Sequence, residues 1–573
     1  MSEFGLDSKL VIDETIAGQN VHDLKSFITD KNYPFVSDQQ NGSYSNQVSF
    51  DLSGLVSNSS YLSLQNSYIL LPMSVSLTST QAWGTAIPPS AVCMKSNYLN
   101  LIDSIQVFVN NKQLVDQTTM SNLPVSILSK LEMSTADLKL EGKGLGITPD
   151  TYSSVGYTKT PSTAATDGYY NNKVLPGAVT DFQVEKSQNK GIVERSSMFV
   201  NCSTVTDTTG SLPAIDITSA TTKATSCQAQ GLPYFSAGTD NSGTTAAAWN
   251  FIAYIPLRRL SDLFARMPLI KNSQIRLIMN LNLGSVVVGT AVTTNNISLT
   301  SATNTAGNTI PFMLNQANGV ALPATGTAAT TTISINVQST GTKPSTNGVT
   351  GATYGYPLLP NCRLFCQSLV VAPNYEERIL AKRQQTIRYL DWFQLSINNV
   401  QAGSSYSQTI STALPNVAIA IVVPFQASAS TIFASATGVA QYQSPFDCAP
   451  EQSLPLGMAA FKQLNFQVNG SNMWTNNAQF THDIFCQEVK SLALNGSLKR
   501  ELTSGLMDLT DWQFSPVAIC DLGDRVDAEA DAYQSVVING TNGCAVAVDL
   551  KVFIGYWKTY SLDVITGQME KIF

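Results

Sequence analysis

The sequence has few charged residues. Lys, Arg, Asp and Glu make up 13% of its 573 residues, about half the share of a typical soluble domain. The 33 basic and 40 acidic residues give a formal net charge of -7. A protein that coats nucleic acid needs clustered cations, so this balance disfavours that class. The surface must instead consist of uncharged polar residues or be buried against other copies of the chain.

Histidine is almost absent. The only two are His22 and His482, which excludes a histidine-rich zinc site and means that any catalytic triad would have to use one of them. His482 precedes Cys486 by four residues on an expected helix, which places the two side chains on one face. We weigh a catalytic pair against ordinary helix packing and favour packing, because no third group is in view.

Long apolar runs and a secretion signal are also absent. The longest run, residues 417–423, has the length of a strand, far below the roughly 20 residues of a membrane span. The first residues lack the basic and apolar regions of a signal peptide, which predicts a soluble protein made inside the cell. The nine scattered cysteines predict free, mostly buried thiols. The closest pair, Cys362 and Cys366, would lie about 13 Å apart on a strand, too far for a disulfide.

Alternating or wholly apolar runs of strand length fill most of the sequence, which predicts an all-β protein. Asn, Gly and Ser clusters separate these runs and mark turns. Helical patterns are short. The expected strands are residues 47–52, 67–75, 105–109, 249–254, 274–281, 363–371, 388–395, 417–423 and 545–554, and the expected helices are residues 125–133, 257–265 and 478–492.

The order of these elements repeats between the two halves of the chain. In each half, a strand ending in a proline step leads to a hairpin strand, a helix, an apolar strand with a second proline step, and a long amphipathic strand. Asn and Gly at the hairpin turns tolerate positive φ. The matched segments are Leu71-Pro72 and Val423-Pro424, residues 103–111 and 462–470, and the steps at Pro256 and Pro516. Two similar β-sandwich units are therefore predicted.

Two stretches carry a resemblance to a known family. They are residues 249–264, which begin Trp-Asn-Phe-Ile-Ala-Tyr, and residues 361–373, Asn-Cys-Arg-Leu-Phe-Cys-Gln-Ser-Leu-Val-Val-Ala-Pro. Together with the two sandwich units, they resemble the double jelly-roll major capsid proteins of icosahedral double-stranded DNA viruses, of the virophage, Polinton-like and adintovirus type. The resemblance extends from about residue 45 to the C-terminus and is one of pattern.

The resemblance implies an all-β fold of two consecutive jelly-roll β-sandwiches with short helices and long inserted loops. It divides the chain into an N-terminal arm (1–44), a first jelly roll (45–373) and a second jelly roll (374–573). Two polar insertions, at about 136–248 and 285–355, would be the outer loops that lock a trimer, and the arm would face inward. Stretch 7–24 is then either an amphipathic segment for a partner's groove or a frayed end.

The function implied is structural. Homotrimeric, pseudo-hexagonal capsomers would tile an icosahedral capsid around a double-stranded DNA genome, assembled inside the infected host cell and carried in the virion. Neighbouring capsomers, penton and minor capsid proteins would be the partners, without sequence-specific nucleic-acid binding. No enzyme activity, cofactor, catalytic residue, cofactor-binding residue or metal ligand is expected. The alternative is a β-sandwich surface adhesin or carbohydrate-binding protein, and a third possibility is a β-sandwich glycoside hydrolase.

Two charged segments have alternative interpretations. Asp527, Glu529 and Asp531 have the spacing of a calcium loop, but Ala532 and Ile538 replace the Gly and Glu that such a loop requires, so we favour a solvated loop over a metal site. The basic residues of the connector between the halves are offset by Glu376 and Glu377; they are either solvated or face the genome or an inner membrane. These basic residues are Arg378, Lys382, Arg383 and Arg388.

Overall fold

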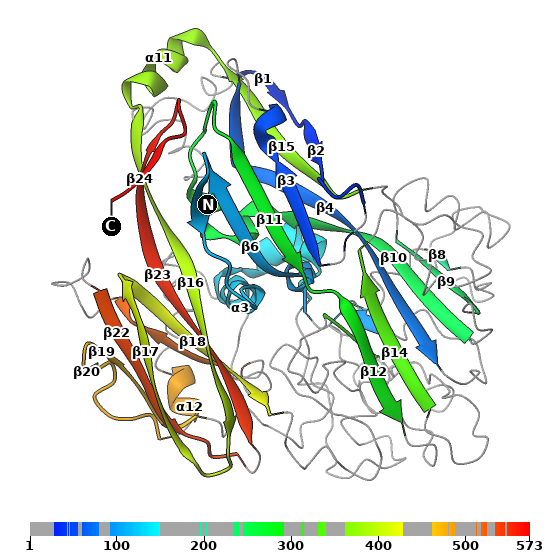
Figure 1. The fold of residues 1–573 in the computed structure, drawn as a ribbon, viewed down its shortest axis with the longest axis vertical. Helices are drawn as coiled ribbons and strands as arrows, with labels where there is room; N and C mark the ends of the chain where they lie inside the picture. The colour runs from blue at the N-terminus through cyan, green and yellow to red at the C-terminus, as the bar shows by residue number, and fades with distance from the viewer. Residues whose placement is uncertain are drawn as a thin grey trace.

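The computed structural model describes residues 28–55, 60–79, 92–148, 233–290, 311–314, 331–339, 361–427, 461–486, 517–523, 533–544 and 547–572, with short gaps inside several ranges, together with Arg195, Cys202–Ser203 and Trp512. These residues form two β-sandwiches that lie side by side (Figure 1). The strands of both run in broadly the same direction, along the longest axis of the molecule.

The first sandwich consists of a large sheet and a four-stranded sheet. In the large sheet, β1 (Ile28–Asn32) and β2 (Phe35–Ser37) both pair with β15, followed across the sheet by β4, β10, β9 and β8. A pair of strands, β12 and β14, extends it beside β4. The other bounds are β15 (Arg363–Val371), β4 (Tyr61–Ser79), β10 (Thr245–Pro256), β9 (Tyr234–Thr239), β8 (Cys202–Ser203), β12 (Gly284–Thr290) and β14 (Thr331–Gln338). The facing sheet has the order β3 (Gln47–Asp51), β11 (Ile275–Leu281), β6 (Ile102–Val109) and β7 (Lys112–Val115), and a separate two-stranded sheet pairs β5 (Val92–Met94) with β13 (Phe312–Leu314).

The second sandwich has two sheets of similar size. One has the order β16 (Gln384–Val400), β23 (Val548–Asp563), β18 (Val417–Gln426) and β21 (Ala518–Asp521), with β24 (Met569–Lys571) added beside β23. The other has the order β17 (Ser405–Pro415), β22 (Tyr533–Thr541), β19 (Lys462–Val468) and β20 (Ser471–Asn472).

Both sandwiches have the same strand order. When β1 and β2 are counted as one interrupted strand and the added strands are set aside, the first, eighth, third and sixth strands form one sheet of each sandwich. The second, seventh, fourth and fifth strands form the other. All pairings between these strands are antiparallel. This is the arrangement of a jelly roll, and it occurs twice in the chain. The predicted fold class is confirmed.

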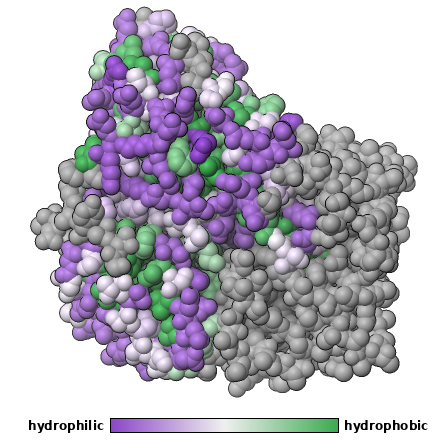
Figure 2. All heavy atoms as spheres, viewed as in Figure 1, coloured by the Kyte–Doolittle hydropathy of each residue, from purple (hydrophilic) through white to green (hydrophobic). Residues whose placement is uncertain are grey.

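Alternation along the strands divides residues between core and surface. On β23, Val548, Leu550, Val552 and Ile554 face the core of the second sandwich. The core of the first sandwich is a second cluster, which also includes Ile387, Tyr389, Tyr560, Leu562 and Met569 from the ends of β16, β23 and β24. Apolar residues of facing sheets fill each interior, as in other sandwiches. The described surface in the view of Figure 2 is mostly hydrophilic, with hydrophobic residues in small groups.

The predicted hairpin turns are present. Asn110 and Asn111 have φ of 47° and 63° between β6 and β7, and Asn469 and Gly470 have φ of 50° and 81° between β19 and β20. Two residues of positive φ make the turn that matches the twist of a two-residue hairpin. The internal repeat deduced from the sequence therefore includes real pairs of equivalent strands.

The helices differ in part from the expectation. The first is α3 (Asn122–Glu132). The helix expected over 257–265 is two short ones, α9 (Leu257–Leu260) and α10 (Asp262–Arg266), because Ser261 is extended and its hydroxyl accepts a hydrogen bond from the amide of Leu263. Of the helix expected over 478–492, α12 (Thr481–Ile484) is described, and residues 487–492 lie outside the described part.

One further expectation needs correction, and another lies outside the described residues. Residues 28–37 of the expected N-terminal arm are strands of the first sandwich, because β1 and β2 hydrogen-bond to β15. Residues 1–27 and Ser43 of that arm lie outside the described part of the chain. The second proline step, Ser515-Pro516, lies outside the described part of the chain, and β21, the counterpart of β10 in the strand order, begins after it at Ala518.

One glycine tests the packing of the second sandwich. Gly540 of β22 lies opposite Tyr406 of β17, and a Cβ at Gly540 would lie 2.5 Å from Cζ of that ring. We expect Gly540→Ala to lower the free energy of unfolding by about 1–3 kcal/mol, because the buried ring cannot move away without disturbing the core. Urea denaturation measures the change.

Gly54→Ala is the matched control, because no atom lies within 4 Å of its added Cβ. It should leave the urea midpoint nearly unchanged. Equal midpoints for the two variants would contradict the close contact between Tyr406 and Gly540.

Candidate functional site at the junction of the two sandwiches

The first sandwich covers an edge of the second. Strand β16 is the outermost strand of its sheet, and an uncovered edge strand is open to pairing with other chains. Here the amide of Leu390 donates to Asp262 Oδ2 at 3.0 Å, and the hydroxyl of Thr118 donates to the carbonyl of Trp392 at 2.7 Å. Side chains of the first sandwich thus satisfy outward-facing backbone groups of β16.

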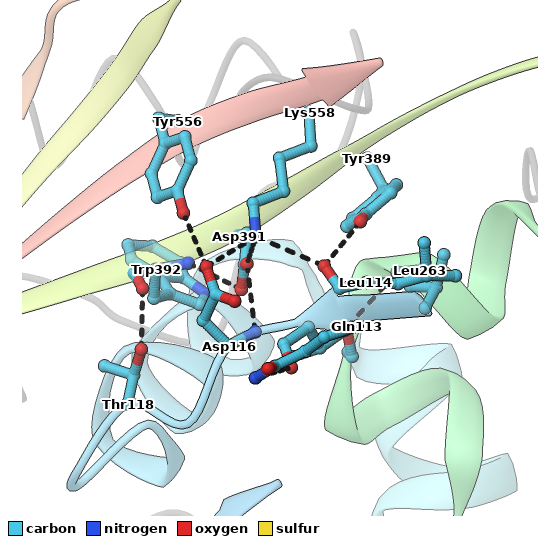
Figure 3. A network of polar contacts seen from close by, with 12 residues as sticks. Gln113, Leu114, Asp116, Thr118, Leu263, Tyr389, Asp391, Trp392, Tyr556 and Lys558 are labelled. Carbon is cyan, nitrogen blue, oxygen red and sulfur yellow. Dashed lines mark hydrogen bonds and ion pairs between the residues drawn. The ribbon is translucent and has the colours of Figure 1, made fainter. Parts of the chain in front are cut away.

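Lys558 lies at the centre of this junction (Figure 3). Its Nζ is 2.5 Å from Asp391 Oδ2 and 2.8 Å from Asp116 Oδ2, and it donates to the carbonyl of Leu114 at 3.2 Å. The hydroxyl of Tyr389 donates to the same carbonyl at 2.6 Å. Asp116 and Leu114 belong to the first sandwich and the other three residues to the second, so the network joins the two.

Burial and opposite charge act together on the ionisable groups. Burial alone would lower the pKa of Lys558, but Asp391, Tyr556 and Asp116 outweigh it and raise that pKa above its ordinary 10.5. Burial raises the pKa of the Asp391 carboxyl, and the Lys558 ammonium opposes that rise. Burial also raises the pKa of Tyr389. The lysine is held charged, and the tyrosine neutral, at neutral pH.

Apolar packing continues the junction across the outer face of the second sandwich's β16–β23–β18–β21 sheet. Helix α3 of the first sandwich lies on this face and buries its own apolar side chains there. This apolar cluster contains Leu123, Ile127 and Leu131 of α3, Trp392, Ile419, Ile421, Ile519 and Phe553 of the sheet, and Phe485 and Trp512 of the second half of the chain. The junction therefore combines an apolar contact with a buried ion-pair network.

The charged groups of the junction pair with one another. Lys558 is 7% exposed and pairs with both carboxylates; that of Asp391 is buried, whereas the side chain of Asp116 is 55% exposed at the edge of the network. Among the described residues, no three His, Cys, Asp or Glu side chains are grouped so that they could hold a metal ion. Within the same residues, no helix is long and apolar enough to cross a bilayer.

The residues singled out from the sequence lie elsewhere. His482 Nε2 is 3.3 Å from Cys486 Sγ, and the histidine ring stacks on Phe485. Cys362 and Cys366 are buried without a disulfide, and burial raises the pKa of the Cys366 thiol to about 12. His22, residues 7–24 and the acidic residues 527–531 lie outside the described part of the chain.

The basic connector residues make local contacts near the start of the second sandwich. Arg383 pairs with Asp563 at 2.6 Å, Arg388 lies over the ring of Trp557 and Arg378 over that of Tyr375. They do not join the Lys558 network. Sequence reasoning missed that network, although Lys558 and Asp391 gave a signal: each is a single charge between aromatic residues of a strand, and a buried charge requires a partner.

Comparison with known proteins gives structural similarities only. No family model and no curated protein sequence matches the chain. A chain in the cryo-EM structure of the Sputnik virophage matches with 11% identity and a TM-score of 0.48, over 95% of this chain and 89% of that one. The mavirus major capsid protein matches with 11% identity and a TM-score of 0.45 (94% and 89%), and the Faustovirus major capsid protein with 11% and 0.41 (97% and 97%). Because all three TM-scores lie below 0.5, the fold is assigned from this chain's own strand order.

The junction predicts unequal effects for two ion pairs. Lys558→Met leaves the buried carboxylate of Asp391 without its partner and should cost about 3–5 kcal/mol of unfolding free energy. Adding Asp391→Leu should restore most of that loss, because no buried charge then remains unpaired. Arg383→Met removes the ion pair with Asp563, in which the arginine side chain is 51% exposed. This variant should lose far less unfolding free energy than Lys558→Met. Chemical denaturation giving equal losses for Lys558→Met and Arg383→Met would contradict a buried network.

Alkaline pH should weaken the junction. A group whose pKa is raised by folding stabilises the fold below its unfolded value, and this contribution is lost as pH rises further. For Lys558 the unfolded value is 10.5, and the raised pKa values of Tyr389 and Tyr556, from 10.0, act in the same direction. The free energy of unfolding should therefore fall above about pH 10. Thermal denaturation from pH 8 to 11 should show a shallower fall in Lys558→Met, and identical slopes would refute the assignment.

Proposed function

We propose that this chain is a viral major capsid protein, three copies of which form a pseudo-hexagonal capsomer of an icosahedral shell around a double-stranded DNA genome. The observation that carries this proposal is the jelly-roll strand order found twice in one chain. A duplicated sandwich suits a building block, because it gives one chain two similar lobes.

Geometry links the duplicated fold to tiling. Two similar sandwiches fixed side by side give a chain with two similar lobes, and three chains around a threefold axis give six such lobes. A unit with six similar sides can meet six neighbours, so identical trimers can cover a surface. Closed symmetric assembly of this kind is the usual form of a homo-oligomer.

The junction supports a building block in another way. A shell subunit must keep the angle between its two lobes constant, and a flexible linker alone would not do so. Here a buried ion-pair network, a covered edge strand and the packing of α3 all fix the second sandwich against the first. The low charge content, 13% of residues, is consistent with a chain that buries polar surface against neighbours.

Under this proposal, residues 374–573 form the second jelly roll and the preceding part the first. The polar insertions at about 136–248 and 285–355 lock the trimer, and residues 1–27 form the inward-facing arm. Neighbouring capsomers, penton proteins and minor capsid proteins are the partners. Assembly takes place in the infected host cell, and the protein resides in the virion without catalytic activity.

The proposal predicts a trimer in solution. Sedimentation of the purified full chain should give a particle of three 61.6-kDa chains, about 185 kDa, that persists on dilution. The mass should be the same at 0.1 and 1 M NaCl, because buried contacts are screened less than surface charges. Monomers at every concentration would overturn the proposal.

A further inference from the structure

The outer face of one sheet is covered in the second jelly roll, whereas the equivalent face of the first jelly roll carries exposed side chains. In the second sandwich, the outer face of the β16–β23–β18–β21 sheet is covered by α3 of the first sandwich together with Phe485 and Trp512 of the second half of the chain. Trp392 is 8% exposed on this face, and Ile419, Ile421 and Phe553 are 1%, 0% and 0% exposed. The equivalent sheet of the first sandwich consists of β1 and β2, β15, β4 and β10.

On that sheet of the first sandwich, the outer face carries exposed aromatic side chains. We call Tyr33, Phe35, Tyr68, Tyr254 and Phe365 the aromatic patch. Phe35 is 47% exposed, Tyr33 41% and Tyr254 38%. Their chain neighbours Leu364, Ala253 and Ile255 are fully buried in the core, which places the patch on the opposite, outer side of the sheet.

The patch is continuous across neighbouring strands. Phe365 of β15 pairs with Phe35 of β2 on one side and with Tyr68 of β4 on the other. The rings of Tyr68 and Phe365 are stacked at 5.1 Å, those of Phe35 and Phe365 are 5.4 Å apart, and those of Tyr68 and Tyr254 are 5.1 Å apart. Side chains that hold one another in this way lose little freedom when a partner covers them.

Polar groups border the aromatic patch and fix its shape. The guanidinium of Arg363 lies 4.8 Å from the centre of the Phe35 ring. Gln367 donates to the hydroxyl of Tyr33 at 2.9 Å and accepts from the amide of Asn66 at 2.8 Å. Aromatic residues with an arginine, surrounded by polar groups, are the composition of protein–protein contact sites.

We propose that the aromatic patch is the contact site for the second sandwich of a neighbouring copy of this chain. The contact repeats, between chains, the relation that already exists within the chain, in which one sandwich covers the outer face of the equivalent sheet of the other. This inference rests on the proposed capsomer, since it assigns a surface to the contact between its chains.

In the proposed contact, first and second sandwiches alternate around a ring of chains, so the ring can close. The first sandwich covers the second within each chain, and the second sandwich of the next chain covers the first. Such a contact joins two different surfaces, so it generates either a closed ring or an open filament. Three chains with six similar sandwiches close the ring, whereas contact between two aromatic patches would stop at a dimer.

Charged substitutions at the exposed aromatic residues test the proposal. The variant carrying Phe35→Glu and Tyr254→Glu should remain folded, because both side chains are exposed in the single chain. Its trimer should dissociate at a concentration at least about 100-fold higher than the wild type, since central aromatic contacts typically account for 2 kcal/mol or more each. Leu380→Glu is the control: Leu380 is 43% exposed on α11 (Pro373–Ala381), outside the aromatic patch, and should leave the trimer intact.

The outcomes separate this inference from the proposed function. A wild-type trimer that the double variant leaves unchanged overturns the inference and retains the capsomer. A wild-type protein that is monomeric overturns both. Loss of the trimer in the double variant alone, with wild-type circular dichroism, supports the inference, and loss in Leu380→Glu as well overturns it.

Crosslinking keeps the test valid if the double variant misfolds. A photoreactive phenylalanine analogue in place of Phe35 preserves an aromatic ring at that position. On irradiation of the full-length protein, mass spectrometry should find crosslinks between chains to residues 384–572, which contain the second sandwich. Crosslinks to the first sandwich of a neighbour, or no crosslinks between chains, would overturn the proposal.

Discussion

The second sandwich has an edge strand with unpaired backbone groups and an outer sheet face with apolar side chains, and exposing both to solvent would be unfavourable. The first sandwich covers them, and this contact determines how the two sandwiches are oriented. Strand β16 offers unpaired backbone groups and its sheet offers Trp392, Ile421 and Phe553. Asp262, Thr118 and α3 of the first sandwich cover them. A buried ion pair contributes little net stability compared with apolar residues of similar volume, and in some proteins it favours one arrangement over others. The Lys558 network therefore serves mainly to fix the orientation of the sandwiches.

Duplication of the fold duplicates this requirement. Each jelly roll has an outer sheet face over its first, eighth, third and sixth strands. The chain provides a cover for that face of the second sandwich, whereas Phe35, Tyr33 and Tyr254 remain exposed on the first. A chain in which one of two equivalent sheet faces is covered and the other is exposed is suited to assembly. In the proposed capsomer, fold, junction and assembly would all depend on one physical need, the covering of a sheet face.

The order of elements could be predicted from the sequence, but their faces and contacts could not. Alternating runs and the Asn-Asn and Asn-Gly turns act locally, so they identify strands and hairpins reliably. The matched proline steps show the limit: Leu71 faces the core, whereas Val423 faces α3. The strands within residues 28–37 and the pairing of Lys558 with Asp116 depend on residues distant in sequence. A single sequence gives no sign of such contacts beyond an isolated charge in an apolar strand.

Electron microscopy of the purified full chain tests the central claim most directly, because it shows the arrangement of lobes. The account predicts threefold class averages with six lobes of similar size around a centre, in which each chain contributes two adjacent lobes. Particles with two lobes only, or open chains of lobes without a closed ring, would contradict the account.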